Sequence, residues 1–370
     1  MMRLIKGLLC FAAVFGAMGA AKAMALDVSA RSAILIEADT GKVLYAQNAH
    51  EQLPMASTTK IMTALVALEN GDISDMVTVD ASAYGMEGSS IYLDLEEEIS
   101  LNDLLYGLML SSGNDAAVAI AVHIGGGIGA FADMMNKKAL ELGAYNTNFV
   151  TPNGLHDDQH YTTAYDLARI AAAAMKNPSF REIVSTEYYR AETGERARTF
   201  KNKNRILWEY PGGTGVKTGY TKAAGRCLVF SAEQEGMGLI GVVLNCPDMF
   251  EDAERILDYG FENYETVTMV KAGVTAATVS VNGGEKSLLE LTPAQDIIVP
   301  VEKGGSASYR TRVVTDETIS APVYAGDVLG YIEVLDGDAL LLRRDLIAGE
   351  DIPDAGIDYY FRRIIKRFAA

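Results

Sequence analysis

Residues 54–61 read Pro54-Met55-Ala56-Ser57-Thr58-Thr59-Lys60-Ile61. Pro54 suits the first turn of a helix, and the apolar residues Ile61 and Leu65 follow at helical spacing. Positions three apart share one face of a helix, so this spacing places the Lys60 amine beside the Ser57 hydroxyl. A lysine that desolvation keeps neutral can accept the serine proton and make the hydroxyl a nucleophile. Taken alone, the pair also fits a capped helix on the protein surface.

Two further short motifs follow this helix along the chain. Ser112-Gly113-Asn114 interrupts a helix-rich apolar stretch, and Lys217-Thr218-Gly219 lies on a predicted strand. A polar turn between two helices would explain the first of these motifs if it stood alone. The order of all three, each in its expected structural context, instead favours one site for nucleophilic catalysis.

The composition is that of a folded protein large enough for two domains. The chain has 370 residues, of which 49% are apolar and 22% charged. Its formal net charge of -17 argues against a nucleic-acid partner, because binding phosphates needs a basic surface. Cys227 and Cys246 lie in apolar stretches, which favours two buried thiols over a disulfide.

The N-terminus predicts export from the cytoplasm. Arg3 and Lys6 precede an apolar stretch, and Ala21-Lys22-Ala23 has the small-x-small pattern of a cleavage site. The apolar stretch is too short to span a bilayer comfortably, so residues 1–23 are predicted to be a cleaved signal peptide. The mature protein is expected at the outer face of the cytoplasmic membrane.

The middle of the chain predicts an α+β domain over residues 27–265. A hairpin is expected near its beginning, at residues 32–46, and a group of strands near its end. The expected helices between and after them are residues 57–70, 101–124 with a break at the Ser112 motif, 131–142, 163–175 and 252–259. This order predicts one antiparallel sheet with helices packed on it.

The C-terminal third has a different character. Short strands separated by Gly and Asp turns predict a small all-β domain over residues 266–348. Residues 349–370 are predicted to be a linker and an amphipathic helix, with Ile and Phe on one face and Lys and Arg on the other. We expect that helix to lie on an anionic membrane surface, and docking on the β-rich domain is the alternative.

The motifs together resemble the low-molecular-weight penicillin-binding proteins of the D-alanyl-D-alanine carboxypeptidase type. The stretches that carry the resemblance are Ala38-Asp39-Thr40-Gly41, Ser111 to Ala117, Thr162 to Leu167 and Gly215 to Thr221. The resemblance extends from about residue 27 to the end of the chain. It implies a β-lactamase/transpeptidase-like catalytic domain, a β-rich second domain and a C-terminal membrane anchor.

The resemblance also implies a role for each motif residue. Ser57 would attack the carbonyl between two D-alanines of a peptidoglycan pentapeptide, and β-lactam antibiotics would acylate the same hydroxyl. Lys60 would take the proton, and Lys217 would help to keep Lys60 neutral, because like charges lower a lysine pKa. Ser112 would relay the proton to the leaving amine, and Asn114 would bind the Lys60 amine and a substrate amide. No metal and no cofactor are implied.

The strand motif would recognise the end of the substrate. The resemblance implies that Lys217 and Thr218 receive the terminal carboxylate, and that the N–H groups of Ser57 and Tyr220 bind the oxyanion beside Gly219. Relatives often have histidine where this chain has Tyr220. They also place an arginine after the late strands, for which Arg255 is only a tentative match. Lys203 stands where some relatives carry arginine.

Three other interpretations remain open at this point. A class A-like β-lactamase would need a glutamate for deacylation, and no suitable segment occurs between Gly143 and Thr163. A non-catalytic wall-binding protein could have kept the fold and lost the chemistry, although its motif residues are all present. His156 and His160 have the i, i+4 spacing of a metal site, although they match no site of the family.

Overall fold

A computed structural model of the chain describes residues 26–305, 309–357, 359 and 365. The chain forms two compact units that divide between Asn263 and Tyr264. Each unit is described here by itself. The predicted signal peptide lies outside the described residues, and so does most of the predicted C-terminal helix.

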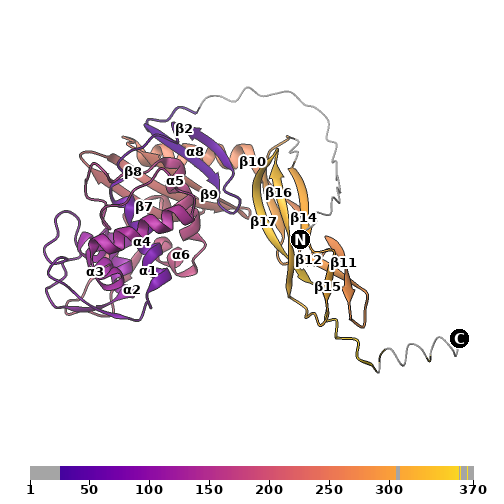
Figure 1. The fold of residues 1–370 in the computed structure, drawn as a ribbon. Coiled ribbons are helices and arrows are strands. Elements are labelled where there is room, and N and C mark those ends of the chain that lie inside the picture. The colour runs from indigo at the N-terminus through magenta and orange to yellow at the C-terminus, as the bar shows by residue number, and fades with distance from the viewer. Residues whose placement is uncertain (1–25, 306–308, 358, 360–364, 366–370) are drawn as a thin grey trace. The chain divides into compact units, whose positions relative to one another are not determined.

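A five-stranded sheet forms the centre of the first unit, in the order β2-β1-β9-β8-β7 (Figure 1). Its strands are β1 (Ser32–Glu37), β2 (Val43–Gln47), β7 (Gly213–Thr221), β8 (Gly225–Gln234) and β9 (Met237–Leu244). Every neighbouring pair is antiparallel. The predicted antiparallel sheet and its early hairpin are therefore confirmed.

Helices cover the sheet on both sides. They are α1 (Lys60–Asn70), α2 (Leu101–Tyr106), α3 (Asn114–Gly125), α4 (Ile128–Glu141), α5 (Ala164–Met175), α6 (Pro178–Ser185), α7 (Ile206–Glu209) and α8 (Met249–Asn263). On β1, Ile34 and Ile36 belong to the core that includes α1 and α5, whereas Leu35 lies against Gly260 of α8. Because successive side chains of a strand point to opposite faces, α5 and α8 lie on opposite faces of the sheet.

The structure refines the predicted elements around the catalytic motifs. The helix expected from residue 57 begins as a 3-10 turn, η1 (Ala56–Thr59), and becomes α-helical at Lys60. The stretch 101–124 breaks as expected, with the π-helical turn Gly107–Ser111 before Ser112 and Asn114 at the start of α3. The sequence did not predict α6, α7 or the two short hairpins, β3 (Met76–Thr78) with β4 (Glu98–Ser100) and β5 (Tyr188–Arg190) with β6 (Thr199–Lys201).

The second unit is all-β, as predicted. Its strands are β10 (Tyr264–Val270), β11 (Ala277–Asn282), β12 (Leu288–Pro293), β13 (Ile297–Glu302), β14 (Tyr309–Thr315), β15 (Thr318–Ser320), β16 (Val328–Asp336) and β17 (Ala339–Ala348). They form a β10-β13 pair and a sheet in the order β14-β16-β17-β12-β11-β15. On β16, the buried Glu333 carboxylate is paired with Arg312 and Arg343 of the two neighbouring strands. A buried charge needs such partners, so this pairing ties the three strands together.

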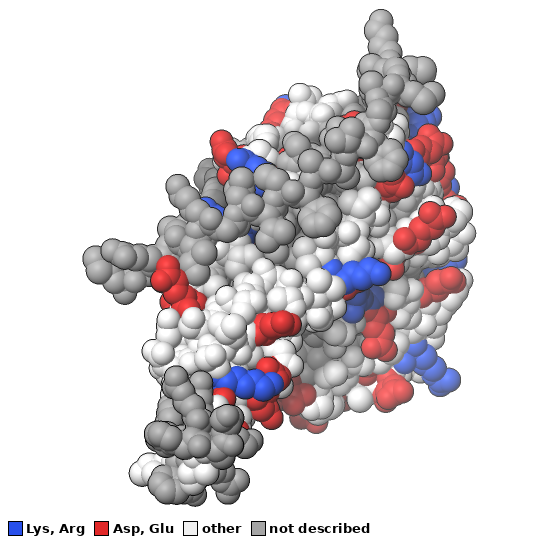
Figure 2. Space-filling view, turned by 90° about the vertical axis from the view of Figure 1, so that its right-hand side faces the viewer, with Lys and Arg blue, Asp and Glu red and all other residues white. Residues whose placement is uncertain are grey.

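The remaining sequence predictions concern cysteines, charge and membranes. Cys227 and Cys246 are free and buried, as expected. On the face shown in Figure 2, Lys and Arg side chains stand among Asp and Glu and form no continuous basic surface. Among the described residues no single helix is long and apolar enough to cross a bilayer, and only the bent pair α3 and α4 satisfies length and composition when taken together.

Candidate active site

The Ser57 hydroxyl lies on a short turn whose neighbours are buried and hydrogen-bonded. In this turn, η1, the Thr58 hydroxyl donates to the Met55 carbonyl at 2.6 Å and the Thr59 hydroxyl to the Ala56 carbonyl at 2.8 Å. Thr58 and Thr59 are fully buried, whereas Ser57 is partly exposed. The turn therefore fixes the backbone around Ser57 and leaves its hydroxyl accessible.

The Lys60 amine is fully buried beside this hydroxyl. Its Nζ lies 3.0 Å from Ser57 Oγ, 2.7 Å from Asn114 Oδ1 and 2.6 Å from the Asn153 carbonyl oxygen. Burial, and after it the positive charges of Lys217 and Lys203, hold the pKa of Lys60 well below its usual range. The predicted contact between Ser57 and Lys60 is present, and Asn114 joins it as expected.

The geometry around Nζ defines which atom can accept a proton. A neutral lysine amine has two N–H donors and one lone pair. The Asn114 and Asn153 oxygens can only accept hydrogen bonds, so together they take both N–H groups. The third contact of Nζ is with Ser57 Oγ. The lone pair of a neutral amine would therefore point toward the serine hydroxyl and could accept its proton. The geometry therefore meets the distance requirement for a base beside a serine hydroxyl.

Asn114, the first residue of α3, contacts Lys60, and Ser112 lies two residues before it in the loop that precedes this helix. The Asn114 Nδ2 group donates to the Glu87 carbonyl at 2.6 Å, which fixes Oδ1 as the atom that faces Lys60. Ser112 is buried and has a left-handed backbone, with φ 64°. Within the described part of the chain its hydroxyl has no hydrogen-bond partner, so it is free to contact a substrate.

The strand β7 passes the nucleophile at close range. A Cβ on Gly219 would lie 3.1 Å from the backbone nitrogens of Ser57 and Thr58. A Cβ at that distance would be in unusually tight contact, so glycine suits a strand that passes so close to the turn, and Tyr220 is the next residue along it. Because β7 is an edge strand of its sheet, alternate backbone groups have no strand partner on its outer side. Substrate groups can pair with them there.

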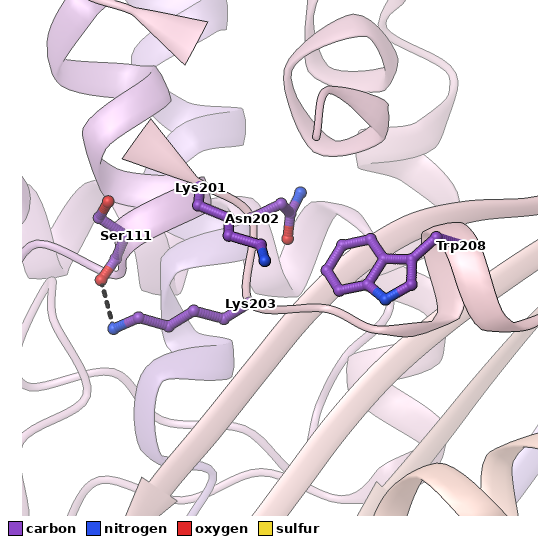
Figure 3. A pocket seen from close by; sticks show the side chains of 5 residues that line it. All are labelled: Ser111, Lys201, Asn202, Lys203 and Trp208. Atoms are coloured by element: carbon purple, nitrogen blue, oxygen red, sulfur yellow. Dashed lines mark hydrogen bonds between the residues drawn. The ribbon is translucent and has the colours of Figure 1, made fainter. Parts of the chain in front are cut away.

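A second buried amine lies on this strand. Lys217 is 1% exposed, and its Nζ donates to the Thr218 carbonyl at 3.1 Å. Burial first, and then the charge of Lys203, lower the pKa of Lys217 to about 7. Lys203 donates to the Ser111 carbonyl at 2.8 Å (Figure 3). Lys203 therefore lies beside the Ser112 motif and near Lys217.

Arg255 does not join this group. It lies on α8, where it is 57% exposed and pairs with Asp252 at 3.1 Å. The tentative match between Arg255 and the carboxylate-binding arginine of relatives is therefore unsupported.

Two groups at the site were missed by the sequence reading. The Asn153 carbonyl on Lys60 is a backbone atom, and the Pro152-Asn153-Gly154 turn was its only signal. His160 is buried, and its Nδ1 accepts the Val150 N–H at 3.0 Å, so its Nε2–H donates to Thr59 Oγ1 at 2.8 Å. Burial lowers the pKa of His160 to about 4. This histidine holds a loop against η1, and the described residues contain no cluster of three or more metal ligands.

Comparison with known proteins agrees with this geometry. Residues 18–248 match the model of the D-alanyl-D-alanine carboxypeptidase family, and residues 264–354 match that of the C-terminal domain of penicillin-binding protein 5. The chain belongs to the D-alanyl-D-alanine carboxypeptidase family. Membership makes it a serine-type peptidase and a hydrolase among the penicillin-binding proteins. The family acts on the D-alanyl-D-alanine ends of peptidoglycan.

Individual relatives cover one or both units. The chain is 39% identical to the D-alanyl-D-alanine carboxypeptidase DacF of Bacillus subtilis, over 90% of this chain and 88% of that protein. The structure of penicillin-binding protein 5 from Haemophilus influenzae matches with a TM-score of 0.70 and 30% identity, over 90% of this chain and all of the other. A carboxypeptidase of Streptomyces sp. is 36% identical over 66% of this chain and 93% of its own length.

Proposed function

We propose that the protein removes the terminal D-alanine of peptidoglycan stem peptides through an acyl-enzyme on Ser57. The observation that carries this proposal is the environment of the Lys60 amine. Two carbonyl oxygens take its N–H groups, and its lone pair faces the Ser57 hydroxyl at 3.0 Å. Such a pair is the requirement for an activated serine in the absence of a histidine base.

Acylation follows from this arrangement. Ser57 Oγ attacks the carbonyl carbon between the two D-alanines while its proton moves to Lys60 Nζ. The negative oxygen that develops is bound by the N–H groups of Ser57 and Tyr220, a pairing that the close approach at Gly219 supports. When the C–N bond breaks, the proton passes through the free hydroxyl of Ser112 to the leaving amine. Asn114 holds Lys60 and a substrate amide during these steps.

The terminal carboxylate of the substrate binds at the other end of the site. Lys217 and Thr218 on β7 receive it, and the Lys203 amine adds a second positive charge nearby. A bound carboxylate stabilises the charged form of Lys217, whose pKa is about 7 in the free enzyme. Binding of the substrate carboxylate therefore favours the protonated, positively charged form of Lys217.

Water then hydrolyses the acyl-enzyme and releases the shortened peptide. β-Lactams react in the acylation step in place of the peptide. They acylate Ser57 because their strained amide sits where the scissile amide would sit. Near Lys60, the loop that contains Asn153 offers a backbone carbonyl, which is a poor base for activating water. The β-lactam adduct should accordingly persist, which separates this enzyme from a class A-like β-lactamase. Apart from the water that releases the acyl group, the proposed steps use only groups of the chain.

The cellular setting belongs to the same proposal. Residues 1–23 direct export, residues 27–265 form the catalytic domain and residues 266–348 the β-rich domain. Residues 349–370 attach the protein to the membrane surface, on the periplasmic or extracellular side. The support is the cleavage pattern at Ala21-Lys22-Ala23 and the apolar and cationic faces of the last residues.

A timed mass-spectrometric experiment tests the proposed function. The full mature chain is mixed with benzylpenicillin, and the adduct is located by peptide mapping as a function of time. The expected result is one adduct on Ser57 that lasts many minutes, together with release of D-alanine from a stem pentapeptide. The Ser57→Ala variant, folded and with an unchanged melting temperature, should show neither. Rapid turnover of penicillin would support a β-lactamase instead, and absence of any adduct would support a non-catalytic protein.

A further inference from the structure

A buried carboxylate next to Asn114 has no part in the reaction described above. Asp115 is 1% exposed and lies in the first turn of α3, directly after Asn114. Its Oδ2 accepts the Ser90 hydroxyl at 2.6 Å and the Leu93 N–H at 3.1 Å, and its Oδ1 accepts the Ile91 N–H at 3.0 Å. A buried carboxylate needs such donors, and these three come from one loop. Asp115 therefore fastens this loop to the start of α3.

The preceding residues of the same loop hold the Asn114 amide. The Asn114 Nδ2 group donates to the Glu87 carbonyl at 2.6 Å, and the Asn114 backbone N–H donates to the Ser89 carbonyl at 2.7 Å. Gly88, between them, has φ 85°, and a Cβ there would lie 2.9 Å from Asn114 Nδ2. The loop passes so close to the amide that glycine suits this position. The loop therefore contacts Asn114 at one end and Asp115 at the other.

The orientation of the Asn114 amide decides where the Lys60 lone pair can point. A side-chain amide can rotate by 180° and exchange its oxygen and its nitrogen, of which only the oxygen accepts hydrogen bonds. With Oδ1 toward Lys60, the amide accepts one amine N–H at 2.7 Å, and the lone pair is left for Ser57. With Nδ2 in that place, the amide would donate to the lone pair, and the amine could no longer accept the serine proton. The Glu87 carbonyl opposes this exchange because it accepts a hydrogen bond from Nδ2.

We propose that Asp115 is a positioning residue for the acylation of Ser57, an inference that rests on the proposed function. Its carboxylate holds the loop of residues 87–93 against α3. The Glu87 carbonyl of that loop then keeps Asn114 Oδ1 on the Lys60 amine. Asp115 takes no part in the proton transfer itself and acts on it through the loop and Asn114.

The same carboxylate brings a negative charge near the base. Burial and the positive charges of Lys217 and Lys203 lower the pKa of Lys60. The charge of Asp115 acts in the opposite direction. The charge of Lys60 also acts on His160, but burial lowers the pKa of this histidine to about 4, so it is neutral at neutral pH. Loss of the Asp115 charge should therefore lower the pKa of Lys60 further and let the amine accept a proton at lower pH.

Two matched substitutions in the full mature chain test this inference. In Asp115→Asn the maximal rate of acylation by a fluorescent penicillin should fall at least about tenfold, because the amide of Asn114 is no longer held. The acid limb of its pH profile should move to lower pH by at least about half a unit. Asp103→Asn is the control, because Asp103 is also 1% exposed, lies in the first turn of α2 and accepts the Thr193 N–H at 2.8 Å. This control should lower the melting temperature to a similar degree, keep the acylation rate within about threefold of the wild type and leave the acid limb in place.

The outcomes separate this inference from the proposed function. An Asp115→Asn protein that is acylated within about twofold of the wild-type rate contradicts the inference alone. So does an equal loss of rate in both variants, or an acid limb of Asp115→Asn that stays in place or moves to higher pH. If the wild type neither forms a Ser57 adduct nor releases D-alanine, the proposed function itself fails.

A second variant replaces Asp115→Asn if that protein does not fold. Ser90→Ala removes one donor to the Asp115 carboxylate and keeps its charge. The acylation rate should then fall at least about threefold, while the acid limb stays where it is in the wild type. A Ser90→Ala protein with the wild-type rate would contradict the inference.

Discussion

At the scale of single residues, the site contains two buried lysine amines whose pKa values the fold lowers. Lys60 and Lys217 are both buried, and Lys203 lies near enough to lower the pKa of each. In the proposed mechanism they have opposite tasks, since Lys60 must be neutral to take a proton and Lys217 must be charged to bind a carboxylate. The rate of acylation should therefore rise with pH as Lys60 loses its proton and fall again as Lys217 loses its own.

Removing the Lys203 amine should shift the pH profile of acylation. In Lys203→Gln a positive charge near both lysines is lost, so the pKa of Lys60 and that of Lys217 should both rise. Both limbs of the pH profile for acylation by a fluorescent penicillin are expected to shift to higher pH, with slower acylation on the acid side. Stopped-flow rates between pH 5 and 10 measure this. If neither limb of the pH profile shifts, Lys203 does not lower the pKa of Lys60 or of Lys217.

His160 should give the protein a specific sensitivity to acid. Its pKa is about 4 in the folded chain and near 6.5 when unfolded, so between these values the unfolded state binds more protons. Stability from this residue is present above pH 6.5 and is lost as pH falls to about 4. The loss is roughly 3 kcal/mol at 1.36 kcal/mol per pKa unit. Urea unfolding at pH 7 and 4.5 measures it.

The variant His160→Gln provides the control for that experiment. Glutamine can keep a hydrogen bond to Thr59, but it does not titrate. The variant should be less stable than the wild type at pH 7 and should lose less stability on acidification. An equal loss in both proteins would assign the acid sensitivity to other groups.

At the scale of elements, the site is built by segments that meet at backbone contacts. Gly154, with φ 83°, lies so close to η1 that a Cβ there would be 1.9 Å from the Ala56 carbonyl oxygen. The same loop places the Asn153 carbonyl on Lys60. Its position therefore controls both the geometry of the nucleophile turn and one of the two acceptors that orient the base.

A pair of glycine substitutions tests this contact. Gly154→Ala should destabilise the protein by at least about 3 kcal/mol, since overpacking costs about 1–3 kcal/mol and a left-handed non-glycine residue about 1–2 kcal/mol more. The penicillin acylation rate of the protein that still folds should fall at least about a hundredfold. Gly126→Ala has a similar φ of 72° but open space around it, so it isolates the backbone cost. Similar effects from both substitutions would contradict the proposed role of the contact.

The sequence predicts those parts of the site that are local in the chain. Ser57 and Lys60 meet because helical spacing brings them together, and the break at Ser112 follows from polar residues within an apolar stretch. The meeting of Asn114 and Lys217 with this pair depended on the family resemblance, since no local pattern joins them. The Asn153 carbonyl could not be assigned, because a backbone atom has no residue type that marks it. The short helix α7, with Trp208, was missed because four residues carry too little periodicity.

At the scale of the whole molecule, the chain consists of a catalytic unit and an all-β unit that divide at Asn263 and Tyr264. All the motif residues belong to the first unit. The match to the Streptomyces relative covers 66% of this chain and 93% of that protein, a share close to the size of the catalytic unit alone. We therefore expect the catalytic unit of this chain to build the site without the all-β unit.

A truncated protein tests whether the catalytic unit folds and reacts without the all-β unit. Residues 26–263, expressed alone, are expected to fold cooperatively and to be acylated by penicillin within about threefold of the rate of the full mature chain. The comparison uses circular dichroism melting and the same fluorescent-penicillin assay. A truncated protein that folds but reacts more than tenfold more slowly would mean that the second unit contributes to the site.

The most direct test concerns the proton of the Lys60 amine. The NMR signal of Lys60 Nζ and its neighbouring Cε can be followed with pH in isotope-labelled enzyme and assigned with Lys60→Arg. We predict that Lys60 titrates well below the usual lysine pKa of 10.5, and that its titration coincides with the acid limb of Ser57 acylation. A Lys60 amine that remains charged over the pH range in which Ser57 reacts would contradict the proposed mechanism.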